Sequence, residues 1–444
     1  MISAFANCLK IPELRNRIFF TMGMVFVSRI ITAVPTPGVN AAELERAITA
    51  AQQKTGGGIL GWLDLFAGGA LSRCAVGALT IWPYISASII IQLMTAIVPT
   101  LERLKQEGET GRQTITQYTR YLTLAICCVQ GLFLAMSLEN YAQLGFDRPI
   151  VMNPGWGFRL LTVLALTTAT MLLMWLGEQI TERGLGNGVS LIITVNIVSS
   201  LPQALAQVVQ MNNDPNITPF HFIALVLMIF LVTAGTILLT QGQRKVPIHS
   251  AKRVVGKKVY GGQNSYMPLR VNYGGVMPII FAGAMLTFPT MLIGRLPWDW
   301  AGTFSRLLAM GEPVYLAAYA GMIMFFSYFW VATQFNPLRI ADDLKKNSSY
   351  VPGIRPGRPT AEYLDTTMTK VTFFGALFLT VIAVIPDVLG AKFGVPWLVA
   401  SFMGGTSLLI IVAVILDTMR QAESHLVMRH YDGFLNTGRI RGRR

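Results

Sequence analysis

The sequence of 444 residues is strongly apolar and strongly basic. Hydrophobic residues make up 52% of it, charged residues only 13%, and the mean hydropathy is +0.50, which excludes a water-soluble globular protein and a disordered chain. The formal net charge of +14 must lie largely in loops, where it concerns partners at a membrane surface. The four cysteines form no C-x-x-C motif and are interpreted as free thiols.

Ten segments are apolar and long enough to be transmembrane helices, which need about 20 residues. The polar start before the first segment, MISAFANCLKIPELRNR, lacks the small-residue cleavage site of a signal peptide, so the first segment is expected to be retained. We therefore predict an all-α, multi-pass integral membrane protein. In chain order the predicted spans are Ile18–Val34, Ala75–Val98, Thr116–Leu138, Trp156–Trp175, Gly188–Val209, Phe220–Thr240, Gly274–Ile293, Val314–Phe335, Val371–Ile385 and Pro396–Leu416.

The distribution of positive charge predicts the orientation of these spans. Most of the 36 Lys and Arg residues fall in cytoplasmic segments if the N-terminus is cytoplasmic, and ten spans then return the C-terminus to the same side. Arg29 is an exception, because it lies inside the first span near its outer end. Its long side chain is expected to extend to the membrane interface in preference to serving in a proton relay.

A short apolar segment, Ile59–Ala70, lies between the first two spans. As a helix it would be about 18 Å long, whereas the hydrocarbon layer is about 30 Å thick. A helix of this length can lie at membrane depth only where protein or water surrounds it. The segment at about residues 59–72 therefore predicts a cavity within the membrane part of the protein.

Two halves of five spans each are predicted, residues 1–210 and 211–444. An odd number of spans per half makes the second half run opposite to the first. In each half the second span carries a proline that is followed two residues later by isoleucine, in Pro83-Tyr84-Ile85 and Pro278-Ile279-Ile280. Interrupted spans at matching positions of inverted halves point to a central path, although proline is also tolerated in ordinary membrane helices.

The spans carry no sign of an enzyme or an ion-coupled pump. No Asp or Glu lies in their interiors, whereas proton- and ion-coupled transporters usually carry ionisable residues there. The four histidines have no metal-ligand spacing. Gly184–Gly188, GLGNG, is not a phosphate-binding loop, because Val189 stands where the third glycine belongs and no strand precedes it. We expect no enzymatic activity, cofactor or metal, and interpret GLGNG as a turn.

Two long loops, residues 241–273 and 336–370, are expected on the cytoplasmic side. The first has seven basic residues and no acid, and its stretch Arg253–Gln263 is typical of a small hairpin. The second contains PGIRPGRP, Pro352–Pro359, which predicts a tight turn. These charges can serve topology alone, but their density favours docking of an anionic partner, either RNA phosphate or an acidic protein face. The candidate docking residues are Arg244, Lys245, Lys252, Arg253, Lys257, Lys258, Arg355 and Arg358.

Seven sequence blocks closely resemble SecY, the channel subunit of the bacterial protein-export translocon. They occur in the order found in that family and cover most of the chain between about Pro12 and Asp417. The blocks are FAGGALSR (Phe66–Arg73), PYISASIIIQL (Pro83–Leu93), KQEGETGR (Lys105–Arg112), MWLGEQITERGLGNG (Met174–Gly188), AKRVVGKKVY (Ala251–Tyr260), PGIRPG (Pro352–Gly357) and GGTSLLI (Gly404–Ile410).

The resemblance implies an hourglass channel, with the helices around a central pore and a ring of aliphatic side chains at its waist. Such a ring holds back ions by excluding water, yet parts around an extended chain. Ile81 and Ile85, and likewise Val189 and Ile193, are four residues apart and share a helix face; without the resemblance they would be read as ordinary packing. The implied ring is Ile81, Ile85, Val189, Ile193, Ile280 and Ile410; the implied plug helix contains Leu60, Trp62, Leu63, Leu65, Phe66, Gly68 and Gly69; the implied lateral gate, between the second and seventh spans, contains Ser86, Gln92, Phe288 and Pro289.

The implied function is translocation of unfolded secretory proteins across the bacterial cytoplasmic (inner) membrane, with release of transmembrane segments sideways into membrane lipid. The implied partners are the small membrane subunits SecE and SecG, the motor ATPase SecA with Arg355 needed for its coupling, the ribosome with its rRNA, and the preprotein with its signal sequence. Two alternatives remain: a secondary transporter of a small solute, which inverted halves would allow, and a membrane protein that only docks partners. The near absence of charge inside the spans argues against the first, and the short plug-like helix against the second.

Overall fold

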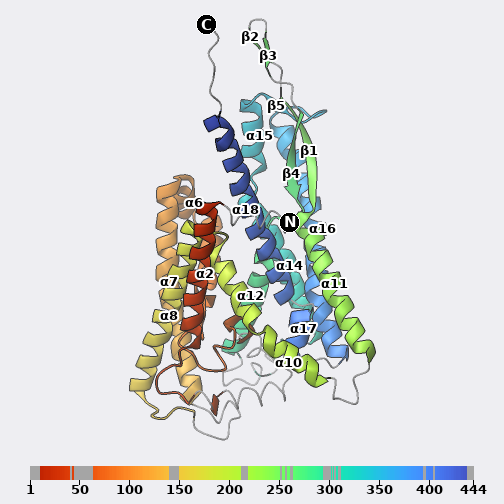
Figure 1. Cartoon of the computed structure of the whole chain (residues 1–444). Coiled ribbons are helices and arrows are strands. Elements are labelled where there is room, and N and C mark those ends of the chain that lie inside the picture. Colours follow the sequence, from red (N-terminus) through yellow and green to blue (C-terminus); the bar gives the residue numbers. More distant parts are fainter. Residues whose placement is uncertain are drawn as a thin grey trace. The chain divides into compact units, whose positions relative to one another are not determined.

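The computed structural model describes residues 11–40, 43–44, 64–139, 150–211, 219–250, 253–255, 258–260, 264–293, 302, 304, 307–308, 312–393, 397–403 and 406–437 (Figure 1). The chain folds into two compact units. The first comprises Met1–Asp214 together with Ile410–Arg444, and the second comprises Pro215–Leu409. The inverted halves 1–210 and 211–444 stay a prediction.

Helices form the framework of the first unit. Helix α7 packs against both α5 and α8, and α2 packs against α8 and α9. Helix α6 follows α5 after a sharp bend at Val98, whose extended conformation is the one that a following proline imposes. The helices are α2 (Pro12–Ala33), α5 (Trp82–Ile97), α6 (Pro99–Gln106), α7 (Glu109–Glu139), α8 (Trp156–Arg183), α9 (Gly188–Ser199), α10 (Leu201–Met211) and most of α18 (Thr406–Thr437).

The prolines expected inside the second and seventh spans stand at helix starts. Pro83 is the second residue of α5 and Pro278 is the second residue of α12 (Met277–Ile293). Proline is favoured in the first turn, because its missing N–H would have no partner inside the helix there and its φ already suits the helix. In the predicted second span, Ala75 forms a β-bridge with Pro35, residues 76–81 are a series of turns, and the helix begins only at Trp82.

Helices and a small sheet form the second unit. Helix α14 packs against both α12 and α16, and α11 also packs against α16. The helices are α11 (Pro219–Gln241), α12, α14 (Pro313–Gln334), α15 (Pro337–Lys346), α16 (Arg358–Phe393) and α17 (Trp397–Met403); the strands are β1 (Gln243–Ser250), β2 (Arg253–Val255), β3 (Lys258–Tyr260), β4 (Asn264–Arg270) and β5 (Ser349–Tyr350).

The two basic loops form one structure. Strand β1 pairs antiparallel with β4 of its own loop and with β5 of the other loop, in the order β4-β1-β5. A buried cluster that includes Val246, Val351 and Leu364 packs the sheet on α16. The predicted hairpin is confirmed, since β2 pairs antiparallel with β3 and extends beyond β1 and β4 (Figure 1). The pairing of the two loops was not predicted, because two-residue strand β5 leaves no pattern in the sequence.

The described residues contain six helices that are long and apolar enough to cross a membrane, or seven if the bent pair α5–α6 is one span. The protein is therefore an all-α multi-pass membrane protein. The count of ten spans stays a prediction. The six are Glu109–Glu139, Trp156–Arg183, Gly188–Met211, Phe222–Gln241, Pro313–Lys346 and Arg358–Ile385.

Candidate functional site

Two of the predicted ring residues meet on α8. A Cβ atom added to Gly177 would lie 3.5 Å from Cδ1 of Ile81 and 3.4 Å from Cγ2 of Val189, so both side chains pack against this glycine. Ile81 is 1% exposed and directly precedes the first residue of α5. Val189 lies in the first turn of α9 and is half-buried. Three helices thus bring two aliphatic side chains together, as the packing of non-directional apolar groups allows.

The four other predicted ring residues are buried, as Ile81 is. Ile85 and Ile193 each lie one helical turn beyond Ile81 and Val189, on α5 and α9. Ile410 lies on α18, and Ile280 on α12 of the second unit. Burial agrees with a ring and with ordinary packing, so the ring itself stays a prediction.

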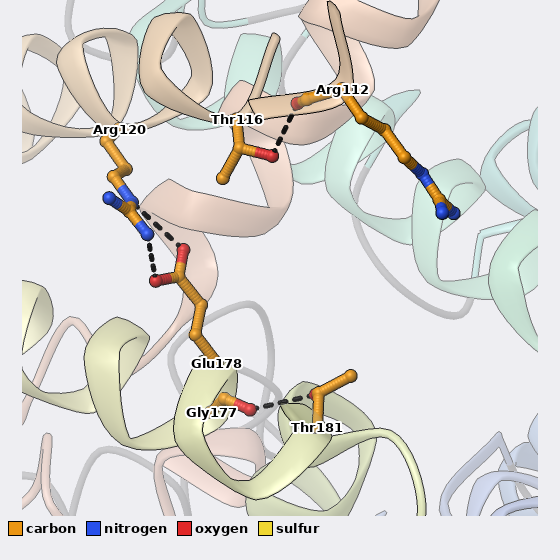
Figure 2. Close-up of polar contacts among 6 residues, drawn as sticks. All are labelled: Arg112, Thr116, Arg120, Gly177, Glu178 and Thr181. Carbon is orange, nitrogen blue, oxygen red and sulfur yellow. Dashed lines mark hydrogen bonds and ion pairs between the residues drawn. The ribbon is translucent and has the colours of Figure 1, made fainter. Parts of the chain in front are cut away.

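The turn between α8 and α9 positions Val189. The Thr181 hydroxyl donates to the carbonyl oxygen of Gly177 at 2.9 Å (Figure 2) and accepts from the backbone N–H of Gly188 at 2.9 Å. Asn187 caps α9 by accepting from the backbone N–H of Ser190 at 3.2 Å. GLGNG is therefore a turn, as predicted.

The same turn is bound to other helices of the first unit. The backbone N–H of Gly186 donates to Oε1 of Gln421 on α18 at 3.0 Å, and that of Leu185 donates to the hydroxyl of Thr21 on α2 at 3.0 Å. Leu185 also packs in a buried cluster with Leu14 and Ala422. The start of α9 is thus fixed by α2, α8 and α18.

An ion pair joins α7 to α8 (Figure 2). Nε of Arg120 lies 3.2 Å from Oε1 of Glu178, and Nη2 lies 2.5 Å from Oε2, which is the bidentate geometry that suits a guanidinium and a carboxylate. Figure 2 shows Arg112 extending away from this pair. The pair was not predicted, because a separation of 58 residues carries no pairing signal in the sequence.

Replacing Glu178 with glutamine is expected to lower the free energy of unfolding by about 1 kcal/mol, because the charge-assisted hydrogen bonds to Arg120 are lost. The effect stays this small because the Arg120 side chain is 44% exposed, so water screens the pair. Thermal unfolding of the purified protein in detergent measures the change. The matched control is Glu362→Gln, since the Arg358–Glu362 pair is exposed and 3.7 Å long, and should give no measurable shift. Equal shifts in both variants would contradict the expectation.

The described part of the predicted plug is a compact turn that begins at Asp64. Leu65 and Phe66 are 2% and 4% exposed, and the ring of Phe66 packs edge-on against Trp82 at the start of α5, with 5.5 Å between centroids. Gly68 and Gly69 have φ values of 63° and 80°, which favour glycine. Leu60, Trp62 and Leu63 lie outside the described residues.

Hydrogen bonds close this turn on itself. Oδ1 of Asp64 accepts from the backbone N–H of Ser72 at 2.9 Å, and the Ser72 hydroxyl donates to the carbonyl oxygen of Gly69 at 3.0 Å. Cys74 follows as a free, buried thiol, and burial raises its pKa to about 11, so it carries no thiolate at neutral pH. Cys127 and Cys128 are free as well, as predicted.

Arg29 forms polar contacts within the first unit, whereas its position led us to expect only that its side chain extends to the membrane interface. Its Nη1 donates to Oδ1 of Asn196 on α9 at 2.9 Å, and its Nη2 lies 3.5 Å from the carbonyl oxygen of Gly68. This arrangement was not predicted, because Arg29 and Asn196 are 167 residues apart in the sequence. A polar residue inside a span was the available signal, since such residues need a partner.

The four predicted gate residues lie on two helices, α5 and α12. Ser86 and Gln92 lie on α5, where Nε2 of Gln92 donates to the Ser88 hydroxyl at 3.3 Å, and Phe288 and Pro289 lie on α12 of the second unit. Their role in a gate stays a prediction.

Those of the predicted docking residues that the structure describes lie in the second unit. Arg244 and Lys245 are exposed on β1, and Arg355 and Arg358 lie at the turn before α16. Gly353 and Gly357 have φ values of 81° and 103°, which confirms the predicted turn. Arg253 and Lys258 belong to β2 and β3, whereas Lys252 and Lys257 lie outside the described residues.

Comparison with known proteins agrees with the resemblance. The SecY family model matches residues 75–419. The protein translocase subunit SecY of Escherichia coli K12 is 43% identical over 437 residues, which cover 97% of this chain and 96% of that protein. The SecY subunit of Chlamydia trachomatis is 41% identical, and both chains are fully covered.

Solved structures share the fold. A protein-conducting channel matches with a TM-score of 0.63 at 15% identity, over 93% of this chain and 92% of that one. A SecY protein whose plug domain stabilises its closed state matches with a TM-score of 0.62 at 16% identity and the same coverage. A small-solute transporter is not supported. The chain belongs to the SecY family of protein translocase subunits and is a protein-conducting channel, not an enzyme.

Proposed function

We propose that unfolded chains pass through this protein at a constriction formed by Ile81, Ile85, Val189, Ile193, Ile280 and Ile410. The observation that carries the proposal is the packing of Ile81 and Val189 on Gly177. The next residue after Ile81, Trp82, packs against Phe66 of the proposed plug. Aliphatic side chains suit this role, because they exclude water from a narrow opening and offer no directional bonds that would hold a passing chain.

The closed state in this proposal is completed by the segment that begins at Asp64, which acts as the plug. Ser86 and Gln92 on α5, with Phe288 and Pro289 on α12, form the gate through which apolar segments leave into lipid. Moving an apolar segment from water into the hydrocarbon layer lowers its free energy in proportion to the apolar area that leaves water. An opening toward lipid is therefore sufficient to separate an apolar segment, which enters the lipid, from a polar chain, which does not.

The partners follow from the charge of the second unit. Positive charge is exposed on the sheet β4-β1-β5 and the adjoining start of α16, which together we call the basic domain. It comes from Arg244 and Lys245 on β1 and from Arg355 at the turn before α16. We place this domain, and both termini, on the cytoplasmic side of the bacterial inner membrane. There it would dock the ribosome through rRNA phosphates, or SecA. SecE and SecG would complete the membrane complex.

Site-specific crosslinking tests the path. Single cysteines at Ile85 or Ile410, in a cysteine-free background, are expected to crosslink to an export substrate stalled in transit. The matched control is a cysteine at Phe374, which lies on α16 and is 67% exposed, and should give no crosslink. Crosslinks at the control position but at neither ring position would overturn the assignment of the path.

A further inference from the structure

The carbonyl group of Gly68 lies in a cradle built from two helices of the first unit. Arg29 of α2 and Ser199 at the end of α9 approach its oxygen, with Nη2 at 3.5 Å and Oγ at 3.4 Å. The Ser199 hydroxyl also lies 2.6 Å from the carbonyl oxygen of Asn196, and with one proton it serves that acceptor first. Arg29 is therefore the main donor to Gly68.

Asn196 orients this donor. Its Oδ1 accepts from Nη1 of Arg29 at 2.9 Å, and the residue is only 1% exposed. Its Nδ2 group has no hydrogen-bond partner among the residues that the structure describes. The bond to Arg29 therefore satisfies the amide oxygen of Asn196 and sets which side of the amide faces α2, because a guanidinium group can only donate.

The fit of the cradle requires a glycine. A Cβ atom at Gly68 would lie 2.6 Å from Nη1 of Arg29, 2.6 Å from Oγ of Ser199 and 2.9 Å from the carbonyl oxygen of Asn196. The arginine could move aside, but the last of these atoms belongs to the backbone of α9. Gly69, which also has a positive φ, has nothing within 4 Å of the equivalent position.

We propose that Arg29, oriented by Asn196 and assisted by Ser199, is a latch that holds the plug closed through the carbonyl group of Gly68. The proposal rests on the proposed function, in which the segment from Asp64 is the plug. Arg29 is a positioning residue in this role, because it acts on the plug and not on the passing chain. The contacts to Gly68 are near the long limit of hydrogen bonds, which suits a latch that must release.

Ion conductance of the purified membrane complex in planar bilayers, without substrate, tests the latch. Arg29→Gln is expected to raise the frequency of ion-conducting openings about tenfold, as the loss of one hydrogen bond from a charged donor would. Arg29→Lys keeps the charge but loses the fork that reaches both acceptors, so it should give a smaller rise. In a chain that lacks Asp64–Ala70, Arg29→Gln should change nothing further.

The plug-deleted background decides whether Arg29 acts through the plug. An Arg29→Gln effect of equal size in both backgrounds would show that Arg29 acts elsewhere, and no effect in the intact chain would overturn the latch directly. If deletion of Asp64–Ala70 itself leaves conductance unchanged, the plug assignment fails, and the latch fails with it. A failure of the latch alone leaves the deletion effect in place, so the two failures are distinguishable.

A glycine pair supplies an independent test that leaves Arg29 intact. Gly68→Ala and Gly69→Ala carry similar backbone strain, but only the first puts an atom into the cradle. Gly68→Ala is expected to raise the frequency of openings several-fold above Gly69→Ala. Equal frequencies in the two variants would contradict the proposal. This test stays decisive even if Arg29→Gln does not fold.

Discussion

Deleting Asp64–Ala70 is expected to make the closed channel conduct ions at least tenfold more often. The deleted segment buries Leu65 and Phe66 almost completely, and burial of such side chains is worth about 1.5–3 kcal/mol each. The closed state alone loses this free energy if the segment leaves its site on opening, so the equilibrium shifts toward open states. Single-channel recording in planar bilayers measures the frequency of openings.

A seven-residue stretch of glycine and serine in place of Asp64–Ala70 separates the loss of the plug from the loss of loop length. It should leak as the deletion does, because it keeps the length but none of the buried side chains. Conductance at the unmodified level in both variants would contradict a plug. Conductance restored by the flexible stretch alone would show that the loop length matters and the side chains do not.

The sequence predicted those features of the fold that depend on neighbouring residues. Apolar runs of sufficient length located the helices of the membrane part, and the alternating stretch Arg253–Gln263 located the hairpin of β2 and β3. GLGNG was recognised as a turn because its glycines did not match a phosphate-binding loop. In each case the relevant interactions lie within a few residues along the chain.

Long-range contacts escaped prediction. The bond from Arg29 to Asn196 and the pair of Arg120 and Glu178 join residues 167 and 58 positions apart, and neither leaves a periodic pattern. Pro83 and Pro278 were expected inside their spans, because an apolar run does not show whether its first residues form turns or helix. The shared position of the two prolines was visible in the sequence, but their structural meaning as helix starts was not.

The candidate site shows the same division. The aliphatic residues were named from the resemblance, whereas the contacts that position two of them are long-range contacts between helices. Thr181 joins the end of α8 to the first N–H of α9, and Gly177 packs between Ile81 and Val189. Such contacts depend on how closely two helices approach, which single-residue propensities do not encode.

Gly188→Ala is expected to lower the free energy of unfolding by roughly 3 kcal/mol or more. The added methyl group would overpack the contact between the start of α9 and the backbone of α8, which leaves no room for it. A Cβ atom at Gly188 would lie 2.0 Å from the carbonyl oxygen of Gly177, so α8 and α9 would have to separate. Gly188 has no positive φ, so the backbone conformation itself would accept alanine. Thermal unfolding in detergent measures the loss.

Gly157→Ala is the matched control, because Gly157 lies in the first turn of α8 and has nothing within 4 Å of its added Cβ. Alanine has the higher helix propensity, so this variant should be as stable as the unmodified protein or slightly more stable. Separation of α8 from α9 would also move Val189 away from Ile81, so Gly188→Ala should leak ions even where it remains folded. A folded, destabilised variant with a tight seal would show that the apposition of these two side chains does not close the pore.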